Sequence, residues 1–237
     1  MTGAASCNHV RPLDVRRLGI VPYAEALELQ RALAEERRHD RIPDTLLLLQ
    51  HPAVITLGVK GDGGRSHIVA TPERLQALGI DVHETGRGGD ITYHGPGQLV
   101  GYPILDLKPD RQDVHRYVRD LEDVMMRVCA DYGIEAGRIA GCSGTWVGEG
   151  KGAEKIGAIG VRISRWITSH GFAFNVHTNL DHFRLIVPCG IRDRGVTSLA
   201  ALLGRSVAME DVEAAFARHL ADVFERGPIA DRAPAAQ

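Results

Sequence analysis

Three apolar segments between residues 145 and 176 restrict the possible folds of this chain more than any other feature of its sequence. They are Thr145–Gly148, Ile156–Ile163 and Ile167–Val176, with short connections between them. Apolar runs that follow one another at this spacing are typical of consecutive strands joined by hairpins. The segments therefore predict an antiparallel sheet in the second half of the chain.

The strongest helical pattern lies just before these strands, at Arg111–Tyr132. Its apolar residues recur at helical spacing, and Gly133 follows as a stop signal. The face expected to be buried consists of Val114, Val118, Leu121, Met125, Val128 and Tyr132.

Helices and strands also alternate in the rest of the chain. Further helices are expected at Pro22–Arg38 and Met209–Arg226, with a short one capped by Thr71. Val15–Ile20 and Thr45–Leu49 have the composition of strands. Strands in runs with helices between them predict an α+β fold, a single domain with a mixed, mainly antiparallel sheet flanked by helices.

The length of 237 residues suits one domain, and the sequence contains no internal repeat or long linker. We expect a flexible leader at 1–13, the domain at 14–226 and a disordered tail at 227–237. No run of about 18 apolar residues is present, which predicts that no segment spans a membrane. The first residues lack a basic stretch followed by an apolar one, so we expect a cytoplasmic protein.

The charge balance excludes one class of function and draws attention to one residue type. A net charge of -2 argues against nucleic-acid binding, for which a basic excess is expected. Lysine, unlike arginine, can lose its proton when its surroundings lower its pKa. Only a few of the 28 basic residues are lysines, and each is therefore a candidate for proton transfer: Lys60, Lys108, Lys151 and Lys155.

The 4 cysteines lie far apart without a CxxC pair, which predicts reduced thiols. Cys189 lies in VPCGI, between a proline and a glycine, as expected for an accessible thiol on a loop. Cys142 is the rival nucleophile, whereas Cys129 lies beside the apolar stripe of the long helix and Cys7 in the leader. A thiol exchanges readily with thioesters, and its acyl-enzyme stays reactive toward amines, so an exposed cysteine favours acyl transfer.

Such a thiol needs a partner, because a free cysteine with a pKa near 8.5 is only a few per cent ionised at neutral pH. The candidates are His94, His170 and His177, in or beside glycine-containing segments, and Lys155, which begins the apolar strand IGAIGVRI. Partial burial lowers the pKa of a lysine and suits it to proton exchange. The residues alone leave these alternatives open.

Metal and nucleotide sites have no positive signal in the sequence. His177 and His182 stand five positions apart without further ligands, so we expect no metal site. No GxxxxGK[ST] motif occurs, and the glycines of 86–101 do not form GxGxxG after a strand. This glycine-rich segment predicts a loop–strand–loop structure in which backbone approaches a ligand.

Residues 87–102, RGGDITYHGPGQLVGY, resemble the signature of the lipoyl(octanoyl) transferases position by position. Other blocks of that family follow in order: HPAVITLG (51–58), EKIGAIGVR (154–162), HGFAFNV (170–176), IVPCGI and VTSL (196–199). The resemblance covers roughly residues 14–220, and a signature with this many fixed positions is specific.

This resemblance implies a fold like the catalytic domain of biotin and lipoate ligases. It also implies the transfer of octanoate from acyl carrier protein to a lysine of lipoyl domains, those of 2-oxoacid dehydrogenase complexes and of the glycine cleavage H protein. The family works through a cysteine thioester, without a cofactor, and we expect a monomer. Carried over, Cys189 is the nucleophile and Lys155 is the lysine that lowers its pKa. Lys155 is chosen over Lys151 because only Lys155 directly precedes the Ile-Gly-Ala-Ile-Gly strand.

The substrate site implied by the resemblance contains many small residues. Their lack of bulk suggests a channel for a thin acyl chain, in which burying about seven methylene or methyl groups yields on the order of 5–6 kcal/mol before ordering costs. The expected substrate-binding residues are Arg87, Gly88, Gly89, Asp90, Ile91, Thr92, Tyr93, His94, Ala158, Ile159, Gly160, Gly171, Phe172 and Ala173.

Three other functions compete with this interpretation: an ATP-dependent lipoate or biotin ligase, a lipoyl-protein amidotransferase on the same fold, and a non-catalytic lipid carrier. The GRGRxGR-like pattern of biotin ligases is missing, and a lipid carrier would not need Cys189 together with Lys155. An acidic carrier protein would require a local basic patch near the site, for which the candidates are Arg162, Arg165, Arg184 and Arg192.

Overall fold

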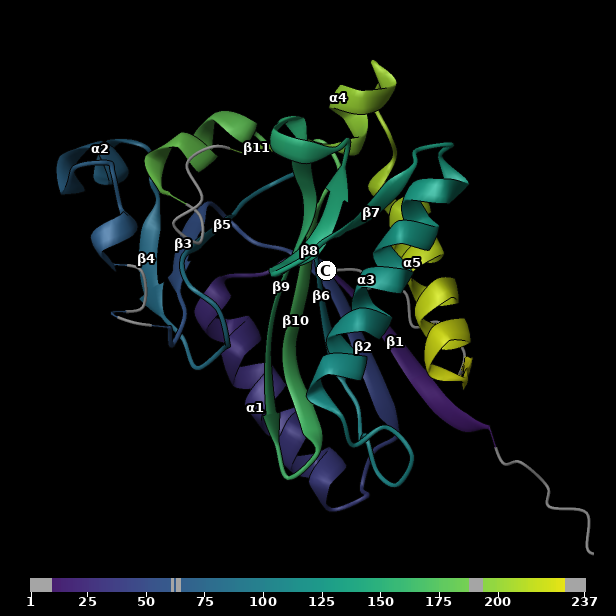
Figure 1. Cartoon of the computed structure of the whole chain (residues 1–237). Coiled ribbons are helices and arrows are strands. Elements are labelled where there is room, and N and C mark those ends of the chain that lie inside the picture. The colour runs from purple at the N-terminus through teal and green to yellow at the C-terminus, as the bar shows by residue number, and fades with distance from the viewer. Residues whose placement is uncertain (1–9, 61, 63–64, 188–193, 229–237) are drawn as a thin grey trace, which may run out of the picture.

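A long mixed sheet forms the centre of the fold (Figure 1). The structure is a computed structural model that describes residues 10–60, 62, 65–187 and 194–228. The sheet has the order β12-β1-β2-β6-β10-β9-β8-β7, and β11 pairs with β9. Its strands are β1 (Arg11–Ile20), β2 (Asp44–Gln50), β6 (Gln98–Ile104), β7 (Ala136–Ile139), β8 (Cys142–Val147), β9 (Glu154–Ser164), β10 (Ile167–Asn175), β11 (Gly195–Val196) and β12 (Arg226–Pro228).

The expected run of hairpin strands is confirmed. β8, β9 and β10 are consecutive antiparallel neighbours, and β10 continues the antiparallel pattern to β6. Parallel pairs occur where β1 meets β2 and β12 and where β11 meets β9. The sheet is therefore mixed and mainly antiparallel, as predicted.

Helices cover both faces of this sheet (Figure 1). α1 (Tyr23–Arg38) contributes to one apolar cluster with side chains of β2, β6 and β10. On the other face α3 (Val114–Asp131) and α5 (Met209–Phe224) enclose the larger core together with the other sides of the same strands. The short helix α4 (Leu199–Leu203) follows β11.

The start of α3 differs from the predicted helix. Asp113 caps it by accepting hydrogen bonds from the backbone N–H groups of His115 and Arg116, so the helix begins three residues later than expected. Val114 at its first position is consequently 45% exposed, and Tyr117 takes its place in the core. The apolar spacing identified the helix but not the cap that sets its beginning.

A second, smaller sheet joins β4 (Asp81–Glu84), β3 (Val54–Leu57) and β5 (Thr92–His94). This part of the fold also contains the helix α2 (Pro72–Ala77) and two 3-10 turns, η1 (Arg65–His67) and η3 (Leu180–Leu185). A third turn, η2 (Gly150–Gly152), precedes β9 in the long sheet. Thr71 caps α2 as predicted. The segment 86–101 was predicted to be a loop, a strand and a second loop. β5 is the predicted strand, but the second loop is short because β6 already begins at Gln98.

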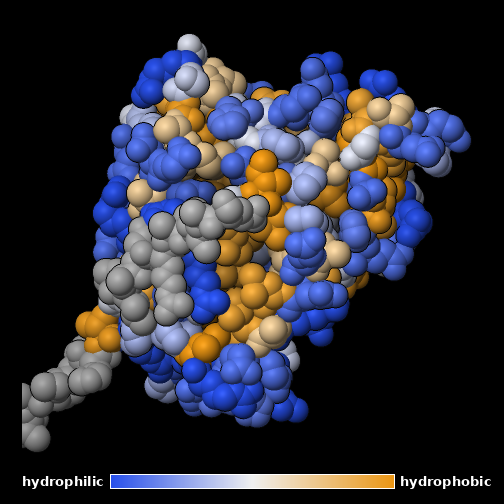
Figure 2. Space-filling model, turned by 180° about the vertical axis from the view of Figure 1, so that it is seen from behind, coloured by the Kyte–Doolittle hydropathy of each residue, from blue (hydrophilic) through white to orange (hydrophobic). Residues whose placement is uncertain are grey.

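The ends of the described chain extend past both expected domain boundaries. β1 begins at Arg11, before residue 14, and β12 includes Gly227 and Pro228, after residue 226. The Arg226 guanidinium, 2.7 Å from Asp44 Oδ2, ties β12 to β2. Among the described helices, none is long and apolar enough to cross a membrane. Figure 2 shows that hydrophilic residues cover much of the face opposite to that of Figure 1, with a hydrophobic strip across its middle.

Candidate active site

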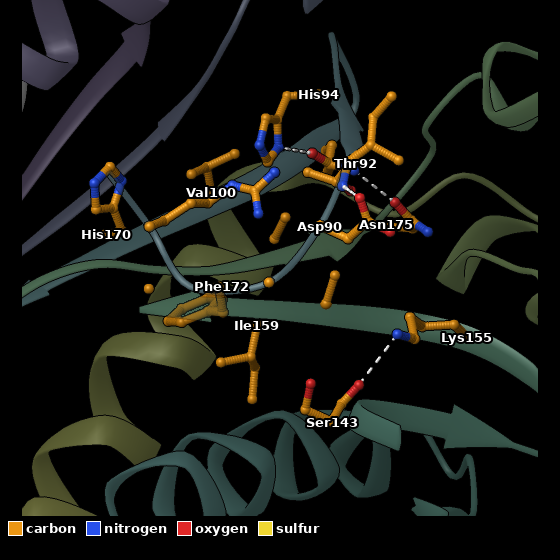
Figure 3. Close-up of a pocket in the computed structure, with 18 of the residues that line it drawn as sticks. Asp90, Thr92, His94, Val100, Ser143, Lys155, Ile159, His170, Phe172 and Asn175 are labelled. Carbon is orange, nitrogen blue, oxygen red and sulfur yellow. Dashed lines mark hydrogen bonds between the residues drawn. The ribbon is translucent and has the colours of Figure 1, made fainter. Parts of the chain in front are cut away.

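A pocket opens between the β5–β6 segment and the β9–β10 hairpin (Figure 3). Lys155 and His170 lie on opposite sides of it, and strand residues of both hairpin strands form the wall between them. The lining residues are Tyr23, Arg87, Gly89, Asp90, Ile91, Thr92, His94, Gln98, Val100, Tyr102, Ser143, Lys155, Ala158, Ile159, Gly160, His170, Gly171, Phe172, Ala173, Asn175, Phe183 and Val196.

All but two of the predicted substrate-binding residues line this pocket. The exceptions are Gly88, whose N–H donates to the Val161 carbonyl at 2.8 Å, and Tyr93. The Tyr93 side chain points to the opposite side of β5, where its hydroxyl lies 2.7 Å from Nδ1 of His182. Strand alternation explains the position of Tyr93. It stands between Thr92 and His94 on β5, and successive side chains of a strand point to opposite faces.

The glycines of the β9–β10 hairpin allow close packing of the backbone, whereas the sequence suggested that they leave room for a channel. Gly160 and Gly171 are directly paired between β9 and β10. A Cβ on Gly171 would lie 2.2 Å from the carbonyl oxygen of Gly101, and one on Gly160 would lie 3.0 Å from that of Gly88. These glycines therefore let backbone approach backbone, and the small pocket-lining side chains are those of Ala158 and Ala173.

We expect Gly171→Ala to destabilise the fold by about 1–3 kcal/mol, because its new methyl group would overlap the Gly101 carbonyl. The matched control is Gly137→Ala in β7, where an added Cβ meets no atom within 4 Å. Denaturant unfolding of both variants measures the difference. Equal free energies of unfolding would contradict the close backbone packing.

Lys155 is half-buried at the start of β9 and is held by two neighbours. Its Nζ donates to the Ser143 carbonyl at 3.1 Å (Figure 3) and lies 4.6 Å from the centre of the Trp146 ring. A carbonyl oxygen and an aromatic face both favour the charged ammonium. Lys151, the alternative lysine, lies exposed in the preceding η2 turn and does not line the pocket.

Cys189 and Arg192 lie outside the described residues, but the chain on both sides of Cys189 is anchored beside the pocket. The N–H of Val187 donates to the carbonyl of His67 at 2.8 Å. After the segment, Val196 is in register with Lys155, and the N–H of Thr197 donates to the Lys155 carbonyl at 3.0 Å. The chain that follows Cys189 thus returns to the backbone of Lys155.

The other candidate cysteines that the structure describes are outside the pocket. Burial raises the pKa of Cys129 to about 12, which leaves it protonated and unreactive. Cys142 begins β8, partly buried, and does not line the pocket.

Two histidines line the pocket, His94 and His170, and both are buried. Burial lowers the pKa of His94 to about 3, so its neutral Nδ1–H donates to Gln98 Oε1 at 2.7 Å. Gln98 then donates to Asn175 Oδ1 at 3.0 Å, and Asn175 donates to the Thr197 carbonyl at 2.9 Å. This chain of hydrogen bonds links β5 to the segment after β11. The Nδ1 atom of His94 is occupied by this network.

Two further buried imidazoles behave in the same way. Burial lowers the pKa of both His51 and His170 to about 4. His51 bridges the Val21 carbonyl and the Tyr102 hydroxyl, each at 2.7 Å. His177, in contrast, is exposed and does not line the pocket, and no group of three potential metal ligands occurs in the described part of the chain.

The lowered pKa values of His51, His94 and His170 predict that the stability of the fold depends on pH. The pKa of each buried imidazole is lower in the folded than in the unfolded state, so stability is complete above about pH 6.5 and is lost as the pH falls toward 4. Between pH 7 and pH 5 we expect a loss of about 2 kcal/mol per buried imidazole. Urea unfolding at both pH values measures it. His115→Gln, at an exposed position, should leave the loss unchanged, whereas a flat stability profile would contradict neutral burial.

Sequence reasoning missed several lining residues. Gln98, Val100 and Tyr102 alternate along β6 and therefore face the pocket together, a period-two signal that was present in GQLVGY. Tyr23 comes from α1 and Ser143 from β8, and no local pattern predicts that such distant segments meet at one pocket.

The four arginines proposed for a basic patch belong to different parts of the chain, and Arg192 lies outside the described residues. Arg165 follows the far end of β9, roughly 30 Å along the extended chain from Lys155. Arg162 lies near that end as well, whereas Arg184 belongs to η3, where it approaches Asp181 Oδ1 at 3.6 Å. Arg162 is paired with Ser169, the neighbour of the pocket-lining His170, so it lies near the end of the pocket that is opposite to Lys155.

Comparison with known proteins decides the family. Residues 22–221 match the family described as Lipoyl protein ligase A/B catalytic domain. The chain belongs to this family. It is 54% identical over 215 residues to an octanoyltransferase of Myxococcus xanthus, covering 90% of this chain and 60% of that protein, so it spans less than two thirds of this relative's length. It is 52% identical to an octanoyltransferase of Solibacter usitatus, covering 91% of this chain and 94% of that one.

Solved structures show the same fold at low sequence identity. A bi-partite lipoate protein ligase from Thermoplasma acidophilum has 17% identity and a TM-score of 0.71, with 94% of this chain and 88% of that chain covered. A biotin protein ligase from Aquifex aeolicus has 13% identity and a TM-score of 0.54, with 90% and 70% covered. The expected fold of the ligase catalytic domain is thereby confirmed for this member of the family.

Proposed function

We propose that this chain is an octanoyltransferase that moves an octanoyl group from acyl carrier protein to a lysine of lipoyl domains through a thioester on Cys189. Relatives at about half identity over most of the chain carry the name octanoyltransferase, which supports the overall reaction. The observation that carries the mechanism is the pairing of β11 with β9, because it connects the chain that follows Cys189 to the backbone of the pocket lysine, Lys155.

The reaction takes place in two acyl transfers. In the first, the Cys189 thiolate attacks the carbonyl carbon of the donor thioester, and the carrier thiolate leaves and takes up a proton. In the second, the amine of the acceptor lysine attacks the Cys189 thioester, loses a proton, and the Cys189 thiolate leaves. Lys155 holds a positive charge near the sulfur and exchanges the proton at Nζ in both steps.

The pocket suits an acyl chain because its walls between Lys155 and His170 carry little charge. Val100, Ile159 and Phe172 contribute apolar surface, and His170 is neutral for the reason given above. Burial of each methylene contributes about 0.8 kcal/mol. Arg87 also lines the pocket, and its guanidinium donates to the Thr56 carbonyl at 2.7 Å.

The test is to incubate the purified protein with octanoyl carrier protein in the absence of ATP. We expect the intact mass to rise by one octanoyl group and peptide mapping to place the group on Cys189. A strict requirement for ATP would favour a ligase, and an adduct on Cys142 would overturn the choice of nucleophile. Transfer from an octanoylated lipoyl domain, with no reaction from carrier protein, would favour an amidotransferase.

The remaining parts of the proposal concern the setting. The acceptors are lipoyl domains of 2-oxoacid dehydrogenase complexes and the glycine cleavage H protein, and the enzyme works in the cytoplasm as a monomer without a cofactor. The domain that does this work includes the strands β1 and β12, so it extends beyond 14–226 at both ends.

A further inference from the structure

Glu122 is a buried carboxylate that has no part in the reaction described above. It lies on α3 with a side chain that is 2% exposed, and it faces β8. Its Oε2 accepts hydrogen bonds from Arg138 Nε at 2.8 Å and from Arg119 at 3.0 Å. Its other oxygen, Oε1, accepts one from the backbone N–H of Gly144 at 3.0 Å.

The Gly144 N–H and the Ser143 carbonyl belong to the same peptide group. This group is planar, and in the trans form its N–H and C=O point in opposite directions. Glu122 therefore binds one side of the peptide, and Lys155 Nζ binds the other side at 3.1 Å. A carboxylate at the N–H end also polarises the group, which makes the carbonyl a stronger acceptor.

Gly144 is shaped for this arrangement. Its φ of +107° is one that residues with a side chain rarely adopt, and an added Cβ would lie 2.4 Å from the Gly157 carbonyl on β9. The pairing of β8 with β9 is irregular at the adjacent residues Thr145 and Trp146. The peptide is thus turned out of the regular ladder, toward Glu122 on one side and Lys155 on the other.

We propose that Glu122 is a positioning residue that fixes the Ser143–Gly144 peptide and, through its carbonyl, sets the place and charge of Lys155. The proposal rests on the proposed function only in taking Lys155 as the residue beside the reacting sulfur. The alternative is that Glu122 merely joins α3 to β7 through its ion pair with Arg138, with Arg119 of the same helix as a second partner.

Three variants separate these roles. Glu122→Gln keeps the length of the side chain and removes its charge, and Glu122→Asp keeps the charge but is one methylene too short to reach Gly144. Arg138→Gln is the matched control, because it breaks the ion pair and leaves the hydrogen bond to Gly144 in place.

The measurement is an NMR titration of protein labelled in its lysine side chains, without any substrate. The sequence has few lysines, so Lys155 is assigned with Lys155→Arg, and Lys151 serves as the internal reference. We expect both Glu122 variants to lower the titration midpoint of Lys155 by about 0.5 pH unit or more. Arg138→Gln should leave the titration midpoint of Lys155 unchanged or raise it slightly. The midpoint of Lys151 should be the same in every variant.

Two results would overturn the proposal: a wild-type midpoint for Lys155 in both Glu122 variants, or a decrease in Arg138→Gln equal to theirs. If Glu122→Gln does not fold, Glu122→Asp decides alone, and a wild-type midpoint there overturns the proposal, because the contact with Gly144 would then not be needed. In the folded variants we also expect slower acylation of Cys189 with an unchanged KM for the donor. Because the titration needs no octanoyl group, a protein that fails to transfer octanoate would refute the proposed function and leave this test intact.

Discussion

Cys189→Ala is expected to abolish octanoyl transfer, with a loss of at least about 10³-fold in the rate, because none of the described residues that line the pocket carries a thiol. The variant should also show no acyl adduct when it is mixed with octanoyl carrier protein. Single-turnover transfer to a lipoyl domain and intact-mass analysis measure the two effects.

Cys142→Ala is the matched control, because it removes a thiol that lies outside the pocket. Its adduct and its rate should equal those of the wild-type protein. Cys189→Ser provides a second check, since a hydroxyl is a weak nucleophile at neutral pH and any ester it forms should accumulate. Full activity in Cys189→Ala would disprove the acyl-enzyme mechanism.

Replacement of Lys155 should separate charge from proton exchange. Lys155→Met removes both and should fail in both half-reactions, by about 10²-fold or more in each. Lys155→Arg keeps the positive charge, so Cys189 should still be acylated, but arginine does not release a proton. We therefore expect the acyl-enzyme to accumulate in the arginine variant and to pass slowly to the acceptor lysine.

Rapid-quench measurements of each half-reaction test this prediction, with Lys151→Met as the control at a neighbouring exposed lysine. An equal loss in both steps for Lys155→Arg would instead indicate that the larger planar head disturbs the contacts with Ser143 and Trp146. Normal rates in Lys155→Met would remove Lys155 from the mechanism.

The strands and helices could be predicted because each has its own local period. The apolar segments of 145–176 gave the β8–β9–β10 order, and the family signature gave most of the pocket wall. Local patterns failed where a side-chain cap set the beginning of a helix. Asp113 moved the start of α3, and with it the place of Val114 in the predicted core.

The site was predictable to the extent that it lies on contiguous motifs. Lys155 was chosen because it precedes an apolar strand, and the structure places it in the pocket while Lys151 stays exposed. The contact of Glu122 with Gly144 had no sequence signal, because it joins a helix to a strand bulge 22 residues away. Such contacts depend on how the elements pack, which no pattern within one element records.

The position of β12 at one edge of the sheet has a practical consequence for handling the protein. Arg11 and Arg226 are paired neighbours in parallel strands, so the first and last described strands lie side by side at this edge. Four strands separate β12 from β9, which places this edge roughly 20 Å or more from the pocket strand. A fluorophore attached to β12 would therefore be separated from Lys155 on β9 by the width of several strands. A short linker between the two ends would also give a circular permutant, whose new termini could be opened at the exposed turn between β9 and β10.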